Sequence, residues 1–345
     1  MNILVTGGAG YVGSHACKSL AAAGFTPVVF DNLSAGHRWA VKWGPLVVGD
    51  LCNGALLRAT IQRYEIKAVL HFAAHSYVGE SVQNPRKYFQ NNLVNTLELL
   101  NAMQDTDVRR IILSSTCATY GHPDSVPMNE SHVQLPVNPY GETKLSVERA
   151  LKWYGEAYGL EWVALRYFNA AGADPDGEIG ESHDPETHLI PLVLEAALSP
   201  HSPVSIFGTN YPTPDGTAIR DYIHVQDLAQ AHVLALQYLR DGGSNEAFNL
   251  GTGFGHSVRE VVAAVERVTQ EKPAVVECGP RAGDPPVLVA DSARAKARLH
   301  WHPHFSALED IVATAWHWRT SSAVETEVVK YTPQSVVSNS ALTSA

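Results

Sequence analysis

A glycine-rich turn near the start of the chain constrains the fold more than any other feature. The apolar run 3–5 has the length of a short buried strand, and residues 7–13 follow with the sequence Gly-Gly-Ala-Gly-Tyr-Val-Gly. An Ala- and Leu-rich segment then continues to Gly24, as in a helix that ends at a glycine. Glycine permits close approach of the backbone to a ligand, and a helix N-terminus attracts a pyrophosphate. The strand–turn–helix context therefore predicts a dinucleotide site, although a ligand-free tight turn would need similar residues.

An acidic residue ends the next predicted strand, which covers residues 27–31. Asp31 follows Gly13 by 18 residues. A carboxylate at this position would bind the ribose hydroxyls of adenosine and repel a 2′-phosphate, which favours NAD over NADP. A helix cap or a turn is the alternative role for Asp31.

Further apolar runs alternate with helical segments along the first half of the chain. The predicted strands are 47–50, 68–74, 111–116 and 162–169, and the predicted helices include 93–103 and 140–158. Near-continuous apolar runs are typical of strands that are buried on both faces of a parallel sheet. Strands that alternate with helices predict an α/β fold with a doubly wound parallel (Rossmann) sheet.

The composition changes after residue 170. Pro, Gly, Asp and Glu are frequent in 172–185, and Pro, Gly and Thr in 199–217. Loops of this kind commonly carry the binding residues of a second lobe. We therefore expect an NAD-binding Rossmann domain over residues 1–170 and a smaller substrate-binding lobe mainly over 171–320. Within the second part we expect Asp227 to cap a helix, residues 247–251 to return to the sheet, 257–269 to form a helix, and 321–345 to form a flexible tail.

Tyr140 and Lys144 are four residues apart in a predicted helix that Pro139 opens. Side chains at this spacing share one helix face, with Cβ atoms about 5–6 Å apart. An ammonium group beside a phenol favours the phenolate and lowers the pKa of the tyrosine, so the pair could act as a base. A solvated helix face would show the same pattern. Thr116, at the end of the predicted strand 111–116, supplies a hydroxyl group 24 residues upstream of Tyr140.

Composition narrows the classes of partner. The chain has 345 residues, is 45% hydrophobic and carries a formal net charge of −10. An acidic surface does not attract a phosphate backbone, so we expect no nucleic-acid partner. We expect neither a signal peptide nor a membrane span. The four cysteines form no CxxC pair, as in reduced thiols of a cytoplasmic protein.

The ordered set of motifs resembles the extended short-chain dehydrogenase/reductases, and within them the nucleotide-sugar 4-epimerases of the bacterial exopolysaccharide type. The resemblance covers residues 1 to about 320. Besides the glycine turn, the Thr116 strand end and the Tyr–Lys pair, it rests on HFAA at 71–74, GESV at 79–82, SSTCATYG at 114–121, NPYG at 138–141, LRYFNAAGA at 165–173 and RDYIHV at 220–225.

The resemblance implies a role for three sets of residues. The catalytic residues would be Thr116, Tyr140 and Lys144. NAD would bind Gly7, Gly10, Tyr11, Val12, Gly13, Asp31, Asn32, Asp50, Leu51, Phe72, Ala73, Ala74 and Asn91, together with Tyr140 and Lys144. A UDP-sugar would contact Thr116, Asn169, Leu189, Phe207, Arg220, Arg281, Asp284 and Leu288. Arginines suit a pyrophosphate because a guanidinium donates paired hydrogen bonds to its oxygens.

The activity that the resemblance implies is reversible inversion at C4 of a UDP-hexose, with UDP-glucose and UDP-galactose as the default pair. Tyr140 would take the proton of the 4-hydroxyl, Thr116 would hydrogen-bond the same oxygen, and Lys144 would hold the nicotinamide ribose. The resulting 4-keto sugar would turn about its link to the pyrophosphate and regain hydride from enzyme-bound NADH on its other face.

Related activities differ at identifiable positions. A nucleotide-sugar 4,6-dehydratase needs a second acid/base pair, and its relatives carry Asp-Glu where this chain has Cys117 and Ala118. The same difference argues against a UDP-glucuronate decarboxylase. A non-catalytic NAD-binding sensor usually lacks the Tyr or the Lys. Epimerisation of UDP-N-acetylglucosamine or of UDP-xylose and UDP-arabinose stays open, because Leu288 lies where the family varies the residue beside the C2 substituent.

Two residues depart from the family pattern. Ser76 stands where some members have a Lys near the nicotinamide, and His188 stands where an Asn lies on the uracil side. Histidines alternate along residues 300–304, as His300, His302 and His304, and three such side chains could bind a metal. A solvated loop explains this pattern better, so we expect no metal. In the family, helices corresponding to 92–103 and 140–158 pair across a two-fold axis, so we expect a homodimer.

Overall fold

The computed structural model describes residues 1–199, 201–281 and 283–321. The predicted flexible tail over 321–345 lies outside these residues except for Ser321.

Within these ranges, seven parallel strands form the central sheet in the order β11–β6–β5–β4–β1–β2–β3. Their bounds are β1 (Asn2–Thr6), β2 (Thr26–Asp31), β3 (Leu46–Val48), β4 (Ala68–His71), β5 (Arg110–Thr116), β6 (Glu161–Tyr167) and β11 (Glu246–Leu250). The chain winds from β1 to one edge through β2 and β3, and then to the other edge through β4, β5 and β6. This order confirms the predicted doubly wound sheet.

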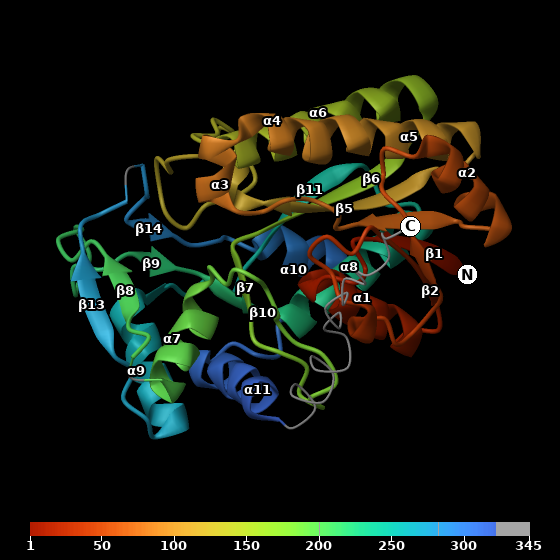
Figure 1. Cartoon of the computed structure of the whole chain (residues 1–345). Helices are drawn as coiled ribbons and strands as arrows, with labels where there is room; N and C mark the ends of the chain where they lie inside the picture. The colour runs from red at the N-terminus through yellow and green to blue at the C-terminus, as the bar shows by residue number, and fades with distance from the viewer. Residues whose placement is uncertain (200, 282, 322–345) are drawn as a thin grey trace, which may run out of the picture.

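Helices cover both faces of the sheet (Figure 1). One face packs against α1 (Tyr11–Ala22), α8 (Val225–Arg240) and α10 (Ala293–Leu299), and the other against α2 (Gly54–Arg63), α5 (Asn95–Asp105) and α6 (Pro139–Tyr158). Strand β1 contributes to the apolar cores on both faces, since Ile3 and Val5 lie in the first core and Leu4 lies in the second. Successive side chains of a strand point to opposite faces, so each buried strand needs apolar residues at every position.

A smaller group of elements lies beside the carboxyl ends of the strands (Figure 1). Its described residues form three small sheets: β7 (Asn169–Ala171) with β10 (Tyr222–His224), β8 (Val204–Phe207) with β13 (Val275–Cys278), and β9 (Ile219–Arg220) between β12 (His256–Ser257) and β14 (Val287–Leu288). Helices α7 (Leu189–Leu198), α9 (Val258–Thr269) and α11 (Leu308–Thr320) pack together in a separate apolar core. The region 199–217 therefore contains a strand, β8, that its Pro- and Gly-rich composition conceals.

Short helices connect the larger elements. They are α3 (Val78–Gln83), α4 (Pro85–Tyr88), a π-helix (Phe89–Val94) that leads directly into α5, and the 3₁₀ helices Arg38–Ala40 and Cys117–Thr119. Among the described residues, no helix combines the length and apolar character that crossing a membrane requires.

Two local expectations for the second half of the chain are wrong. Helix α8 starts at Val225 after His224, and the carboxylate of Asp227 instead accepts the backbone N–H groups of His304 and Phe305 at 2.8 and 3.0 Å. The segment 300–304 is not a fully solvated loop either, because Trp301 is buried and its Nε1 donates to the Asp227 carbonyl oxygen at 3.0 Å. These two residues hold the chain after α10 against α8.

Candidate active site

Local sequence signals place Tyr140 in the first turn of α6. The side chain of Asn138 accepts a hydrogen bond from the Gly141 N–H at 2.9 Å, and Pro139 follows at the first helical position. Lys144 lies one turn later and is buried. Its Nζ donates to the carbonyl oxygen of Ser114 at 2.8 Å, which joins α6 to the end of β5.

Thr116 completes this group as the last residue of β5. Its side chain lies near that of Tyr140 and lowers the pKa of the Tyr140 phenol, and its Oγ1 accepts the Ala118 N–H at 3.2 Å. The structure thus brings together the three residues that the resemblance assigns to catalysis. They come from the carboxyl end of β5 and from the first two turns of α6.

The electrostatics of Tyr140 differ from the expectation. Burial of the hydroxyl raises the pKa of Tyr140 well above its ordinary value, although the residue as a whole is partly exposed. The neighbouring Tyr167 also raises this pKa, while the Thr116 side chain lowers it. The prediction that Lys144 lowers the pKa of Tyr140 below its ordinary value is therefore wrong for the protein without a bound cofactor. Burial also lowers the pKa of Lys144 to about 8, an effect that the carboxylate of Glu148 opposes.

The glycine turn approaches its neighbours too closely for larger residues. A Cβ atom on Gly7 would lie 2.6 Å from the backbone nitrogen of Ala73, and one on Gly13 would lie 2.2 Å from the Gly7 carbonyl oxygen. Gly7 also has a φ of 73°, in the left-handed region that favours glycine. Gly10 immediately precedes α1, whose first turn, Tyr11 to Ser14, has no acidic residue. A pyrophosphate therefore fits this helix N-terminus without like-charge repulsion.

Polar side chains at the ends of β2 and β3 lie next to this turn. The Asp31 carboxylate accepts the Ala9 N–H at 3.0 Å and the Leu33 N–H at 2.8 Å, so Asp31 also has the turn role considered as its alternative. Burial raises the pKa of Asp31, and these two hydrogen bonds lower it. Each carboxylate oxygen has a further lone pair, which leaves capacity for ribose hydroxyls. Asn32 Nδ2 donates to Asp50 Oδ2 at 2.8 Å.

Asn92 is a site residue that the sequence analysis misses. Its side chain accepts the His75 N–H at 2.8 Å and donates to the His75 carbonyl oxygen at 2.9 Å. These bonds hold the loop after β4, which contains the predicted cofactor contacts Phe72, Ala73 and Ala74. Asn91, also predicted, donates to Asn92 Oδ1 at 3.0 Å. A buried Asn in the π-helix has no local sequence signal, because its partner lies 17 residues away.

Two other predicted cofactor contacts have structural partners. The Tyr11 hydroxyl donates to the Gly172 carbonyl oxygen at 2.6 Å and joins the glycine turn to the end of β7. Leu51 is buried in the core beneath α2 and α5. Val12 lies in the first turn of α1.

Most residues predicted to bind the sugar nucleotide lie in the smaller lobe, where contacts join them in two sets. Arg220 is paired with Asp284 at 2.5 Å, and Leu288 lies opposite Arg220 in the β9–β14 register. The Arg281 guanidinium lies over the Phe207 ring, 4.0 Å from its centroid. The charge of Arg220 lowers the pKa of the Cys117 thiol, which places Arg220 close to the Thr116 end of β5. Of the remaining two, Asn169 donates to the Asp221 carbonyl oxygen at 3.1 Å, and Leu189 begins α7.

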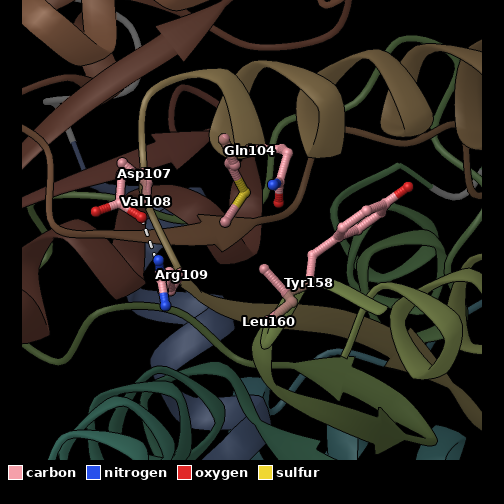
Figure 2. A pocket seen from close by; sticks show the side chains of 7 residues that line it. Gln104, Asp107, Val108, Arg109, Tyr158 and Leu160 are labelled. Atoms are coloured by element: carbon pink, nitrogen blue, oxygen red, sulfur yellow. Dashed lines mark hydrogen bonds and ion pairs between the residues drawn. The ribbon is translucent and has the colours of Figure 1, made fainter. Parts of the chain in front are cut away.

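A hollow at the amino ends of the strands is separate from this site, which lies at their carboxyl ends. Figure 2 shows it at the end of α5 and at the amino ends of β5 and β6, with the Arg109–Asp107 ion pair at its rim. Thr116 and Tyr140 lie at the carboxyl end of β5. The residues that line the hollow are Met103, Gln104, Asp107, Val108, Arg109, Tyr158 and Leu160.

Comparisons with known proteins agree with this geometry. Residues 3–251 match the NAD dependent epimerase/dehydratase family. The chain is 52% identical over 319 residues to a UDP-glucose 4-epimerase of Rhizobium meliloti, which covers 92% of this chain and 97% of the relative. It is also similar to the crystal structure of UDP-glucose 4-epimerase from Brucella ovis in complex with NAD, at 53% identity and a TM-score of 0.90, over 92% of this chain and 98% of that one.

A third similarity is to the UDP-glucose 4-epimerase structure from Stenotrophomonas maltophila with bound NAD and formylated UDP-arabinopyranose. That chain is 40% identical, with a TM-score of 0.90 over 94% of this chain and 99% of that one.

Proposed function

The chain belongs to the NAD dependent epimerase/dehydratase family, and from this premise we propose that it is a UDP-glucose 4-epimerase. It interconverts UDP-glucose and UDP-galactose by inverting C4 of the hexose. The observation that carries this proposal is the meeting of Thr116, Tyr140 and Lys144 at the carboxyl end of β5, on the same edge of the sheet as the glycine turn.

The residues that would hold NAD fit that cofactor. The pyrophosphate would lie at the N-terminus of α1, where glycines keep the backbone accessible, and Asp31 would bind the adenosine ribose. Bound NAD⁺ supplies a hydride acceptor and a positive charge that favours a nearby phenolate. Lys144, with its ammonium fixed by the Ser114 carbonyl, would hold the nicotinamide ribose.

The roles of the catalytic side chains follow from their surroundings. Tyr140 would take the proton of the sugar 4-hydroxyl and return it after C4 has been inverted. Thr116 would hydrogen-bond the same sugar oxygen and orient it toward Tyr140. One residue that exchanges a single proton suffices for epimerisation, because bound NAD would take up and return the hydride and no water is eliminated.

Arg220 and Arg281 would grip the pyrophosphate of the substrate while the hexose turns. Asp284 holds the Arg220 guanidinium from one side at 2.5 Å, and the Phe207 ring holds Arg281. Positioned guanidinium groups donate paired hydrogen bonds to phosphate oxygens with less loss of side-chain entropy. Leu288, opposite Arg220, would lie beside the sugar and limit the size of its C2 substituent.

The structure argues further against a 4,6-dehydratase. Removal of water across C5 and C6 needs an additional acid/base pair beside Thr116. Cys117 occupies that position with a thiol whose pKa burial raises to about 12, and Ala118 has no ionisable group. Neither can exchange protons near neutral pH.

We also infer the assembly and the location of the enzyme. Trp153 and Tyr158 on α6, and Val94 just before α5, are exposed apolar or aromatic residues on the helix layer farthest from the smaller lobe (Figure 1). A second copy packed on this layer would bury them in a homodimer. Light scattering should give twice the chain mass, and a monomer mass would refute the dimer. We propose a cytoplasmic enzyme with an NAD-binding domain over 1–170 and a UDP-sugar lobe mainly over 171–320.

Incubation of the purified protein with UDP-galactose tests the proposed function. We expect UDP-glucose as the product, with no net reduction of NAD and no 4-keto-6-deoxy sugar. Formation of the deoxy sugar would identify a dehydratase, and the absence of any C4 epimer would reject the proposal. Parallel incubations with UDP-N-acetylglucosamine and UDP-xylose would define the substrate range.

A further inference from the structure

Four potential metal ligands converge in the segment between β7 and α7. Glu181, His183, Glu186 and His188 each offer one ligand atom, and these atoms all lie within 4.8 Å of one another. The proposed reaction assigns no role to Glu181, His183 or Glu186, and His188 stands at the position that the family pattern gives to an Asn on the uracil side. Their spacing in sequence does not resemble a common metal motif, so the sequence analysis expects no metal here.

The ligand atoms of the four side chains lie at ion-pair distances from one another. His188 Nδ1 lies 2.8 Å from Glu181 Oε1 and 2.9 Å from Glu186 Oε1, and His183 Nδ1 lies 3.2 Å from Glu181 Oε1. Glu181 Oε1 and His183 Nδ1 are buried, and although they lie 3.2 Å apart, neither makes a well-directed hydrogen bond within the described residues. The Glu181 side chain is only 7% exposed, so water does not readily satisfy this oxygen.

We propose that Glu181, His183, Glu186 and His188 bind one divalent transition-metal ion, with zinc as the preferred ion. Two imidazole nitrogens and two carboxylate oxygens form a donor set that zinc accepts in a tetrahedral arrangement, with ligand distances of about 2.0–2.2 Å. A tetrahedron of that size has ligand–ligand separations of about 3.4 Å. The four separations between imidazole nitrogens and carboxylate oxygens run from 2.8 to 3.6 Å, and all ligand atoms lie within 4.8 Å of one another, so small shifts of these side chains would give this geometry.

The surroundings indicate a structural role for the ion. Four protein ligands close the coordination sphere, which is typical of structural zinc sites. The Tyr11 ring meets His183 edge-on at 6.2 Å, and the Ser182 carbonyl oxygen is 2.9 Å from His37 Nε2. The ion would thereby fix the 172–188 segment against the glycine turn and stabilise the protein without taking part in the reaction.

The opposing hypothesis is a metal-free network of ion pairs. Burial lowers the pKa of each histidine, but the carboxylates of Glu181 and Glu186 outweigh it, so that the pKa of His183 rises to about 9 and that of His188 to about 10. In that case two imidazolium–carboxylate pairs would occupy the cluster, and zinc would have no specific site.

A second acidic group nearby provides a matched control. Asp174, Asp176 and Glu178 also converge, but Lys18 Nζ lies 2.8, 2.7 and 2.7 Å from their carboxylates. The ammonium group already neutralises this cluster, so we expect no metal there. Substitution Glu178→Gln removes a carboxylate of the same segment without touching the proposed ligands.

The test is metal analysis of the full chain purified without a polyhistidine tag, followed by chelation and titration with zinc chloride. We expect about one zinc per chain, binding that raises the melting temperature, and the same behaviour in Glu178→Gln. Loss of a residue that only hydrogen-bonds a metal ligand lowers metal affinity by about 10–100-fold. The variants His183→Ala and Glu186→Gln each remove a ligand itself, so they should weaken zinc binding by more than this. No zinc-dependent shift in melting temperature, or equal binding by parent and His183→Ala, would overturn the proposal.

Cobalt(II) provides a test that needs no variant. A four-coordinate site should give the intense visible absorption of tetrahedral Co²⁺ when the ion is added to the chelated parent protein. Only the weak absorption of six-coordinate Co²⁺ would contradict a closed tetrahedral site. Both tests are independent of catalytic activity, so their outcome is separate from that of the proposed epimerase function.

Discussion

The side chains of Thr116 and Tyr140 meet, although 24 residues separate them and they come from a strand end and a helix start. The Thr116 side chain lowers the pKa of Tyr140 against the opposing effect of burial. This pair also shows where the 4-hydroxyl oxygen of a substrate could meet two hydroxyl groups at once.

Replacement of Thr116 tests the importance of this hydroxyl. Thr116→Val should lower kcat by about 10²-fold, because one positioned hydrogen bond to the reacting oxygen is lost. Thr116→Ser should retain most of the rate, since it keeps the hydroxyl. The measurement is the steady-state rate with UDP-galactose, and a fully active Thr116→Val variant would contradict the assigned role.

The glycine turn allows a prediction about stability. Gly13→Ala should destabilise the fold by about 3 kcal/mol or more, since its Cβ would lie 2.2 Å from the Gly7 carbonyl oxygen. Gly79→Ala is the control, because a Cβ there meets no heavy atom of the described residues within 4 Å. Urea unfolding should show a much lower midpoint for Gly13→Ala than for Gly79→Ala. Equal midpoints would mean that the turn is not as tight as the structure indicates.

The buried Lys144 predicts a pH dependence of stability. Its pKa is lowered from 10.5 to about 8 in the folded protein, so the unfolded chain binds more protons between these values. The Lys144 contribution to the free energy of unfolding should therefore rise from about pH 8 to about pH 10.5, by about 3 kcal/mol at most. The change Lys144→Met should remove this rise, as urea unfolding of both proteins across the range would show. Parallel pH profiles would refute the lowered pKa.

Asp31 predicts the choice of cofactor. Asp31→Asn removes the charge that repels a 2′-phosphate and keeps one oxygen for the Leu33 or Ala9 N–H. The ratio of NADP to NAD affinity should rise by about 10-fold or more, as measured by binding to cofactor-free protein. An unchanged ratio would assign Asp31 to the turn alone.

Local signals in the sequence predict much of the fold. The Asn138–Pro139 start of α6 depends on residues within one turn, and so does the left-handed Gly159 that ends it. The apolar runs predict the parallel strands for the same reason, because burial on both faces requires apolar residues at successive positions.

Features that depend on distant contacts could not be predicted in this way. Asn92 hydrogen-bonds the backbone of His75, and Asp227 accepts a backbone N–H group from the segment after α10. Trp301 is buried in the same segment. Each of these contacts joins residues that are far apart in the sequence. The pKa of Tyr140 is the clearest error. Helical spacing shows which charge is nearby, but it does not show how strongly the fold buries the hydroxyl.

The catalytic assignment of Tyr140 is the central claim, and Tyr140→Phe tests it most directly. The substitution removes one hydroxyl and leaves the Asn138 cap and the Lys144–Ser114 contact intact. We predict that kcat for conversion of UDP-galactose falls by about 10²–10⁴-fold, the usual contribution of a positioned acid/base, while NAD remains bound. An NAD-bound Tyr140→Phe variant that turns over UDP-galactose at the rate of the parent would contradict the account.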